Sequence, residues 1–371
     1  EVFRRFYKKW YRPARMALVC AGDFDNLGAV EKLIKQAFAK CVPSEGQPRV
    51  NPIVDRPLIA PHVEPRITCM VDREATKTSV TVTFKYEASE CATPSGFFTK
   101  TIEDSFKLAL DNRLYKIMRR ADPPFFSAAC SIEEATRTTT IFSLQIVCEE
   151  GKARTGLEAG LREITRARLH GFSEQELRIA SAKQLADAEQ LFIERDQTYC
   201  TSLRDELVGH FLRGEFVVGA EEEARITRAC VERVKTSDLK EFAKRLNVNN
   251  SCVIRAMEGR ARTTEKDISG AIDKVQREEH AGDVTENEMF NVPERLIEEE
   301  SLPPAGKLEG ERKFPKLGFK LVQLSNGMQV AMKQTDFLDD QVLVRCFARG
   351  GLSEVEQKDY LDALYANTIA S

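Results

Sequence analysis

The chain has 371 residues, of which 42% are hydrophobic and 30% are charged. This composition is typical of a globular protein and excludes an intrinsically disordered chain. The 55 basic and 58 acidic residues leave a formal net charge of −3, so no general affinity for nucleic acid or for an anionic membrane surface is indicated. At about 100–200 residues per domain, the length predicts two to three domains.

The ten cysteines are scattered singly and form no CxxC pair. Several lie in apolar runs such as ALVCAG and SCVIRAM, so we interpret them as small buried side chains in a reducing compartment. This predicts an intracellular protein, in the cytosol or in an organelle such as a chloroplast or mitochondrion. No apolar run approaches the ~20 residues that span a bilayer. The opening EVFRRFYKKWY has no initiator methionine and no signal-peptide pattern, and we expect an internal piece of a longer protein.

The first 45 residues are expected to form a helix, a strand and a second helix. In VFRRFYKKWY the aromatic side chains share one helical stripe, and Pro13 prevents the helix from continuing. The apolar run MALVCAG, residues 16–22, has the length of a buried strand, and Asn26 is expected to cap the amphipathic helix LGAVEKLIKQAF. Residues 46–65 are rich in proline and lack periodicity, which predicts a linker.

Residues 66–276 are expected to form one α+β domain. Its first strands are RITCMVD and TSVTVTFKYE, and the second alternates apolar side chains on one face. The long helix TKTIEDSFKLALDNRLYKIMRR is stopped by two prolines, and FFSAACSIEEATRTTTIFSLQIVCE predicts a strand pair that turns at residues 133–136.

The rest of this domain is predicted to be mainly helical. The helix KARTGLEAGLREITRARLHGF ends at Gly171, and Ser173 with Glu176 forms a capping box that opens a helical stretch toward Gly214. A short helix at about 222–231, the helix SDLKEFAKRL, the strand SCVIRAM and the helix EKDISGAIDKV follow.

One internal echo links the two ends of this region. FYKKWYRPARMALVCAGD and FAKRLNVNNSCVIRAMEG have the same order and spacing, so that Phe6 corresponds to Phe242 and Met16 to Cys252. In each case a helix leads into a strand and a second helix follows. The echo suggests two tandem copies of one α+β domain that end in the same way.

Residues 277–318 are acidic, contain prolines and show no periodicity. Since structureless loops inside domains rarely exceed about 12–15 residues, we interpret this stretch as an interdomain connector. Residues 319–371 are expected to be the truncated start of a third domain. There, Asn326 and Gly327 predict a hairpin between FKLVQLS and MQVAMKQ, because both accept positive φ, and DDQVLVRCFARGG predicts a third strand.

Zinc hydrolysis usually needs two ligands one helical turn apart, and the sequence offers no such pair. None of its four histidines lies three to five residues from another, so HExxH and the inverted HxxEH are both absent. A lone histidine is usually structural, and a histidine before a C-terminal glycine suits the helix dipole. We therefore expect no metal ligand among His62, His170, His210 and His280.

Other catalytic schemes find no support in the residues. There is no Gly-rich phosphate loop, no G-x-S-x-G motif, and no cysteine with a nearby base. Glu206 and His210 stand at i and i+4, which predicts a local hydrogen bond or ion pair. The acidic segment TDFLDD, with Asp336, Asp339 and Asp340, is interpreted as a turn between strands.

Two segments of this sequence resemble the pitrilysin/insulinase family of zinc peptidases. FYKKWYRPARMALVCAGDFD resembles the segment near the end of the first domain of those enzymes. LSNGMQVAMKQTDFLDDQVLVRCFARGGLSE is similar to the strand–turn–strand that opens their second half. Between them, RLYKIMRRADPPFFSA, RLHGFSEQEL and ERDQTYCTSLRDELVGHFLRGE resemble the second domain of the plant and algal branch of the family.

The resemblance implies tandem α+β domains of antiparallel sheet packed against helices, a LuxS/mitochondrial-processing-peptidase-like fold. Two halves would form a clamshell around a chamber for peptides. In the family, zinc is held by HxxEH and a downstream Glu, all upstream of the segment that resembles residues 1–12. No catalytic or metal residue is therefore carried over, and no substrate-binding residue is assigned. The place comparable to the zinc helix in the third unit offers Ala363, Tyr365 and Asn367.

The resemblance assigns residues 1–45 to the end of a first domain and 66–276 to a second, non-catalytic domain. The full-length parent protein is expected to be a zinc metalloendopeptidase. This chain would supply chamber and scaffold domains and would be inactive alone. Its partners would be a peptide or unfolded polypeptide and the missing N- and C-terminal domains, with no nucleic acid and no membrane. The alternative is a non-catalytic scaffold or substrate-binding member of the same fold. Of the chain alone, only about residues 60–275 are expected to fold well.

Overall fold

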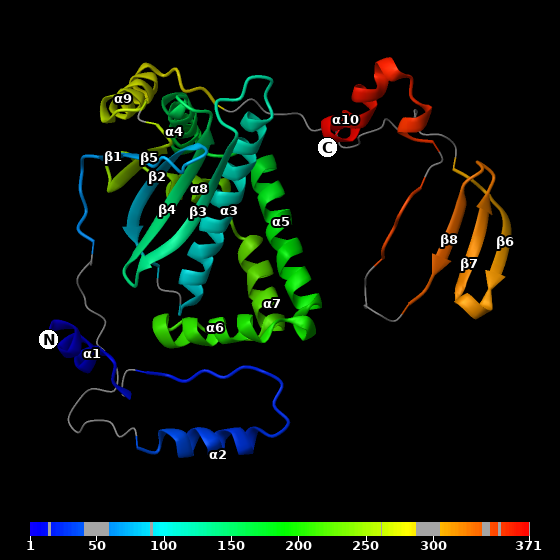
Figure 1. The fold of residues 1–371 in the computed structure, drawn as a ribbon, viewed down its shortest axis with the longest axis horizontal. Helices are drawn as coiled ribbons and strands as arrows, with labels where there is room; N and C mark the ends of the chain where they lie inside the picture. Colours follow the sequence, from blue (N-terminus) through cyan, green and yellow to red (C-terminus); the bar gives the residue numbers. More distant parts are fainter. Residues whose placement is uncertain are drawn as a thin grey trace. The chain divides into compact units, whose positions relative to one another are not determined.

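The computed structural model describes residues 1–13, 16–40, 59–89, 92–260, 262–286, 305–335, 342–347 and 350–370. They belong to two compact units, Glu1–Phe290 and Asn291–Ser371 (Figure 1). Within the described ranges no helix is both long enough and apolar enough to cross a membrane. The cysteines in these ranges are free, and four of them, Cys130, Cys148, Cys230 and Cys252, are buried.

A five-stranded sheet forms the centre of the first unit (Figure 1). Its order is β1-β5-β2-β4-β3, and β1 pairs with β5 in parallel while the other pairs are antiparallel. The strands predicted within residues 66–276 are thereby confirmed, and the parallel edge places the last strand of the sheet beside the first. The bounds are Arg66–Val71 (β1), Thr78–Glu87 (β2), Ser127–Thr136 (β3), Thr139–Cys148 (β4) and Cys252–Glu258 (β5).

One face of this sheet carries the core. Alternate residues of β2 are fully buried, namely Val80, Val82 and Phe84, as their spacing predicts, while the residues between them are half-buried. The β3–β4 turn lies at residues 137–138, and not at 133–136 as predicted, because the ladder runs on to Thr136 opposite Thr139.

Four helices pack around the core face of the sheet. The long helix α3 lies along β3, α4 crosses β4 and β2, α9 packs on α4 and β1, and α8 lies between α3 and α4. α3 begins at Pro94, earlier than predicted, because Thr93 accepts a hydrogen bond from the Gly96 N–H. The bounds are Pro94–Met118 (α3), Ala153–His170 (α4), Thr236–Ala243 (α8) and Glu265–Ala281 (α9).

Helix α4 approaches the sheet closely because it carries two glycines. A Cβ on Gly156 would lie 2.5 Å from the Cys148 Sγ, and a Cβ on Gly160 would lie 2.6 Å from the Ile146 Cδ1. Real Cβ atoms do not approach other atoms this closely, so these positions exclude larger residues at the present spacing.

The helical stretch toward Gly214 consists of separate helices. α5 spans Glu174–Ile193, a 3-10 turn follows at Arg195–Gln197, and α6 spans Cys200–Arg213. α5 packs on α3 and on α7, which spans Ala220–Val231, close to the predicted range.

The N-terminal helices form as predicted, but the strand between them does not. α1 spans Val2–Trp10 and α2 spans Leu27–Phe38, and the Asn26 side chain caps α2 by accepting a hydrogen bond from the Ala29 N–H. Within the described residues, the segment 16–22 has no strand partner, and the prediction of a strand there is wrong. A strand requires a ladder with a neighbour, which apolar sequence alone does not supply. Residues 41–58 lie outside the described ranges.

The connector predicted at 277–318 has regular structure at both ends. α9, which we expected to stop near Val275, continues to Ala281, and Gly282 ends it in the left-handed region. At the other end, residues 308–314 form a strand. Residues 287–304 lie outside the described ranges.

The second unit contains a three-stranded antiparallel sheet in the order β6-β7-β8. The strands are Leu308–Phe314 (β6), Phe319–Leu324 (β7) and Gln329–Lys333 (β8), with a 3-10 turn at Pro315–Leu317. The predicted hairpin is confirmed, and Gly327 has φ +85. Residues 342–347 are not a strand, contrary to the prediction. Two 3-10 turns, Leu352–Glu354 and Gln357–Asp359, precede α10 at Tyr360–Ala370.

Candidate functional site

The four histidines lie apart and each contacts local backbone. One ring nitrogen of each lies within hydrogen-bond distance of a carbonyl oxygen: His62 with Glu64, His170 with Val284, His210 with Glu215 and His280 with Gln276. A ring nitrogen that donates to a carbonyl is not available to a metal. Nowhere in the described ranges do three His, Cys, Asp or Glu side chains come together in a group that could hold a metal ion.

The predicted pair of Glu206 and His210 does not form. The His210 Nδ1 lies 2.5 Å from the Glu215 carbonyl oxygen instead, and this carbonyl lies just beyond the end of α6. The negative charge of Glu206 acts on another acid, since burial first and Glu206 second raise the pKa of Glu223. The segment with Asp336, Asp339 and Asp340 lies outside the described residues.

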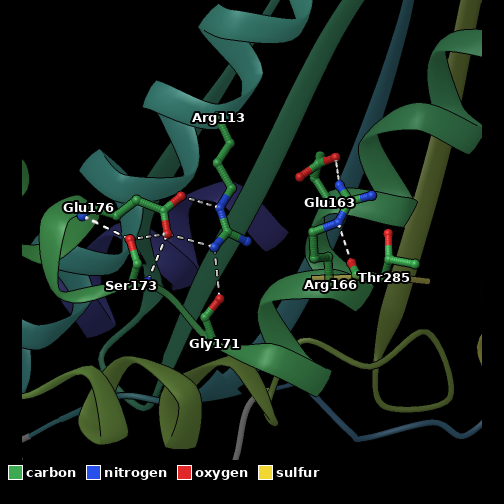
Figure 2. Close-up of polar contacts among 7 residues, drawn as sticks. All are labelled: Arg113, Glu163, Arg166, Gly171, Ser173, Glu176 and Thr285. Carbon is green, nitrogen blue, oxygen red and sulfur yellow. Dashed lines mark hydrogen bonds and ion pairs between the residues drawn. The ribbon is translucent and has the colours of Figure 1, made fainter. Parts of the chain in front are cut away.

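A buried ion pair joins α3 to α5 (Figure 2). Arg113 of α3 is 4% exposed, and its Nε and Nη2 donate to the two carboxylate oxygens of Glu176 at 2.6 and 2.9 Å. Its Nη2 also donates to the Gly171 carbonyl at 2.8 Å, and its guanidinium lies 4.1 Å from the centre of the Phe172 ring. The capping box of Ser173 and Glu176 is confirmed. Glu176 has a second role as the counter-ion of Arg113, and no local sequence pattern indicates that role.

This arrangement is structural. Breaking a buried ion pair from one side costs about 3–5 kcal/mol, because the remaining charge is left uncompensated. Arg113 therefore fixes the start of α5 against α3, and through α5 it positions α7. A guanidinium whose donors point into its own protein has no means of contacting a substrate.

A second set of ion pairs joins α4 to α9. Arg162 donates to both carboxylate oxygens of Glu278 at 2.8 and 2.9 Å, and Lys274 of α9 donates to Glu158 of α4 at 2.6 Å. The hydrogen bond from Arg162 is the main reason why the pKa of Glu278 is lowered. These pairs bind the last helix of the first unit to its core.

The chain just beyond α9 is also held by α4. The Arg166 Nε donates to the Thr285 carbonyl at 2.8 Å (Figure 2), and the His170 Nε2 donates to the Val284 carbonyl at 2.6 Å. The Val284 side chain is buried. Residues up to 286 are thus part of the folded unit.

The most perturbed acid of the first unit is Glu103 on α3. Its side chain is buried, and burial raises its pKa to about 7, while the Tyr86 hydroxyl and Arg245 act in the opposite direction. One of its carboxylate oxygens has no hydrogen-bond partner among the described residues. A carboxyl with a pKa near neutrality is typical of groups that transfer protons or respond to pH. A shifted pKa by itself assigns neither function to Glu103.

Helix α6 presents an apolar stripe to the outside. Leu203, Leu207 and Phe211 are spaced by four residues and are all exposed, so they lie on one face of the helix. Exposed Tyr199, just before α6, and exposed Leu191 and Ile193, at the end of α5, add to the apolar surface. A surface of this kind favours contact with an apolar partner or an unfolded chain.

Comparison with known proteins shows what this chain is similar to. Residues 1–183 match the family described as the peptidase M16 inactive domain. Over 367 residues the chain is 35% identical to a protein of Arabidopsis thaliana named zinc protease PQQL-like. It shares the fold of the periplasmic protease PqqL from Escherichia coli, with a TM-score of 0.65 at 16% identity. The first half of that protease, solved separately, gives a TM-score of 0.63 at 15% identity.

The matches cover most of this chain but a smaller part of each related protein. The Arabidopsis match covers 99% of this chain and 35% of that protein. The match with the E. coli protease covers 90% of this chain and 36% of that chain, and the match with its first half covers 79% and 60%. The chain therefore spans about a third of the length of the full-length proteins it matches.

Proposed function

This chain belongs to the peptidase M16 family, the pitrilysin or insulinase family, and we propose that it is a non-catalytic part of a zinc metalloendopeptidase. The longer protein would hydrolyse peptides in an enclosed chamber, and this chain would supply chamber and scaffold domains while being inactive alone. The observation that carries the proposal is the 35% identity to a zinc protease along 99% of the chain.

The described residues of this chain do not fit a zinc site. Zinc in proteins is held by three or four converging His, Cys, Asp or Glu side chains. The four histidines are far apart in the sequence, and nowhere in the described ranges do three such side chains come together. We therefore assign no step of hydrolysis to these residues and propose that the zinc ligands belong to another part of the longer protein.

The role proposed for the first unit is to bind and position unfolded polypeptide. Its core and two sets of ion pairs hold its helices together, and the exposed stripe of Leu203, Leu207 and Phe211 offers an apolar contact surface. The partners would be the remaining domains of the same protein and a peptide substrate.

Metal analysis and a peptidase assay, run on this chain and on the longer protein, test the proposal. We expect bound zinc and chelator-sensitive cleavage of labelled casein in the longer protein alone. Stoichiometric zinc in this chain would contradict our placement of the site. No zinc and no cleavage in either protein would favour a non-catalytic scaffold or substrate-binding member of the family.

The apolar stripe has its own test. Leu207→Ser is expected to weaken binding of this chain to reduced, carboxymethylated lactalbumin, because it removes apolar contact area from the middle of the stripe. Val63→Ser, at an exposed position away from α6 in the sequence, is the matched control. Equal binding by both variants would remove α6 from the proposal.

A further inference from the structure

A cavity of about 820 Å³ lies at one end of the central sheet, and the functional proposal makes no use of it. Its walls are the end of β2 with the residues that follow, the start of β4, the turn before β5 and residues 59–61. The volume falls within the roughly 300–1,000 Å³ typical of small-molecule pockets.

The cavity exists because two neighbours of β2 end at different points. β4 pairs with β2 as far as Glu87, opposite Thr139, whereas the ladder between β5 and β2 stops at Phe84, opposite Cys252. Before β5 the chain turns away at Ser251, which has φ 54 and accepts a last hydrogen bond from the Lys85 N–H at 3.4 Å. The sheet therefore has a gap beside the last residues of β2.

Two cations line this gap, Lys85 and Arg245, and neither forms an ion pair with a carboxylate of the described residues. The Lys85 Nζ donates to the His62 Nε2 at 2.9 Å, and burial first and Arg66 second lower the pKa of Lys85. Arg245 lies 5.6 Å from the centre of the Tyr86 ring. Arg113 and Arg162 in the same unit, by contrast, each have a carboxylate partner.

The rest of the lining suits an oxygen-rich anion. Asn250, Thr138 and Thr139, whose side chains carry hydrogen-bond donors, also line the cavity. One carboxylate, Glu87, lies on the lining and is exposed, and it makes no ion pair within the described ranges. Glu103 faces Tyr86 and Arg245 from α3, beside Lys100 and Asp104, and burial raises its pKa to about 7, so that it is largely neutral at pH 6.

We propose that this cavity binds a carboxylate group, with Lys85 and Arg245 as its counter-ions. The carboxylate would come either from a small organic acid or from the free C terminus of a peptide, since both present the same two oxygens. Charge-assisted hydrogen bonds from a lysine and an arginine are the usual means of holding such a group. The inference does not depend on peptidase activity.

Calorimetric titration of the 371-residue chain at pH 6.0 tests the proposal with three probes: succinate, alanyl-alanine and alanyl-alanine amide. We expect saturable binding of at least one of the two acids and none of the amide. Binding of succinate alone would identify a small-acid site, and binding of the dipeptide would identify a peptide C terminus. Failure of both acids to bind, or equal binding by the amide, would overturn the proposal.

Two variants locate the binding in this cavity. Lys85→Met and Arg245→Met each keep an apolar stem while removing one counter-ion, and each is expected to weaken binding about tenfold or more. Lys183→Met, at an exposed position on α5, is the matched control and is expected to bind the acids as tightly as the unsubstituted chain does. Thermal melts of all three variants show that the fold is kept, and binding unchanged in both cavity variants would contradict the proposal.

Discussion

The two helices whose sequences echo each other, α1 and α8, have opposite environments. Phe242 of α8 is 4% exposed and packs edge-on against Phe106, with ring centres 4.9 Å apart. Phe6 of α1 is 56% exposed, and no residue of α1 is buried. The strand that follows α8 is paired on both sides, by β1 and β2, whereas residues 16–22 after α1 have no ladder within the described chain.

The difference shows what a local pattern does and does not specify. Both segments encode a helix with a phenylalanine at the corresponding position, Phe6 in α1 and Phe242 in α8, and both form the helix. Burial of this phenylalanine requires a sheet and a second helix from elsewhere in the chain, which α8 has in β2, α3 and α4. In the functional proposal, the equivalent partners of α1 belong to the first domain of the longer protein. One pair of substitutions tests this comparison directly, and the predictions after it test other contacts of the first unit.

Phe242→Ala is expected to lower the free energy of unfolding by about 3–5 kcal/mol, because it opens a cavity among Phe106, Tyr86 and the core. Phe6→Ala in the same chain is expected to change it by less than about 0.5 kcal/mol, as for other exposed positions. Urea titrations followed by circular dichroism measure both. A large loss of unfolding free energy in Phe6→Ala would show that α1 packs against a partner in solution. The two helices would then not differ in burial as the structure indicates.

Arg113→Met is expected to cost about 3–5 kcal/mol, since it leaves the Glu176 carboxylate buried without its counter-ion. The matched control is Arg225→Met on α7, where Arg225 pairs with Glu222 at the surface and no measurable change is expected. The same urea titrations separate the two. If both variants were equally stable, the pair between α3 and α5 would not hold these helices together.

Stability is expected to fall as pH rises from about 4.5 to 7, through the ionisation of Glu103. Burial raises the pKa of this carboxyl to about 7 in the folded chain, from 4.5. The folded state therefore favours the neutral form, and the penalty for ionisation is absent below pH 4.5 and complete above 7. A shift of this size corresponds to about 3 kcal/mol.

Glu103→Gln removes this group while keeping its shape. The difference in unfolding free energy between the parent and Glu103→Gln should therefore grow in favour of the variant as pH increases over this range. Denaturation at pH 5 and pH 8 measures the difference. A constant difference between the two would contradict the assignment of the titration to Glu103.

Gly160→Ala is expected to cost about 1–2 kcal/mol, because a Cβ there would lie 2.6 Å from Ile146 and 2.9 Å from Leu144. Gly28→Ala on α2 is the control, since among the described residues the only atom within 4 Å of its added Cβ is the Asn26 Oδ1 at 3.4 Å. At Gly28 the higher helix propensity of alanine should stabilise α2 by up to about 1 kcal/mol. Stabilisation by Gly160→Ala, as expected for Gly28→Ala, would show that α4 does not rest on β4 as closely as the structure indicates.

Much of the fold follows from signals within a few residues. Alternation in β2 placed Val80, Val82 and Phe84 on the core face, Ser173 and Glu176 marked the start of α5, and Asn326 with Gly327 marked the hairpin of the second unit. The wrong predictions concern segments whose structure depends on pairing with another strand. The strand predicted at 16–22 has no partner among the described residues, and the turn between β3 and β4 lies later than predicted because the ladder between them is longer than the turn residues indicate.

The sequence by itself determined the α+β class, the order and approximate bounds of most helices and strands, and the resemblance that led to the family. Only the tertiary structure decided that Arg113 pairs with Glu176, 63 positions away, that β5 inserts between β1 and β2, and that a gap is left beside Lys85. Helix caps, turns and periodicity depend on residues within about four positions of one another, and the sequence displays them directly. Ion pairs, ladders and cavities depend on segments that meet only after folding, and no local pattern encodes their meeting.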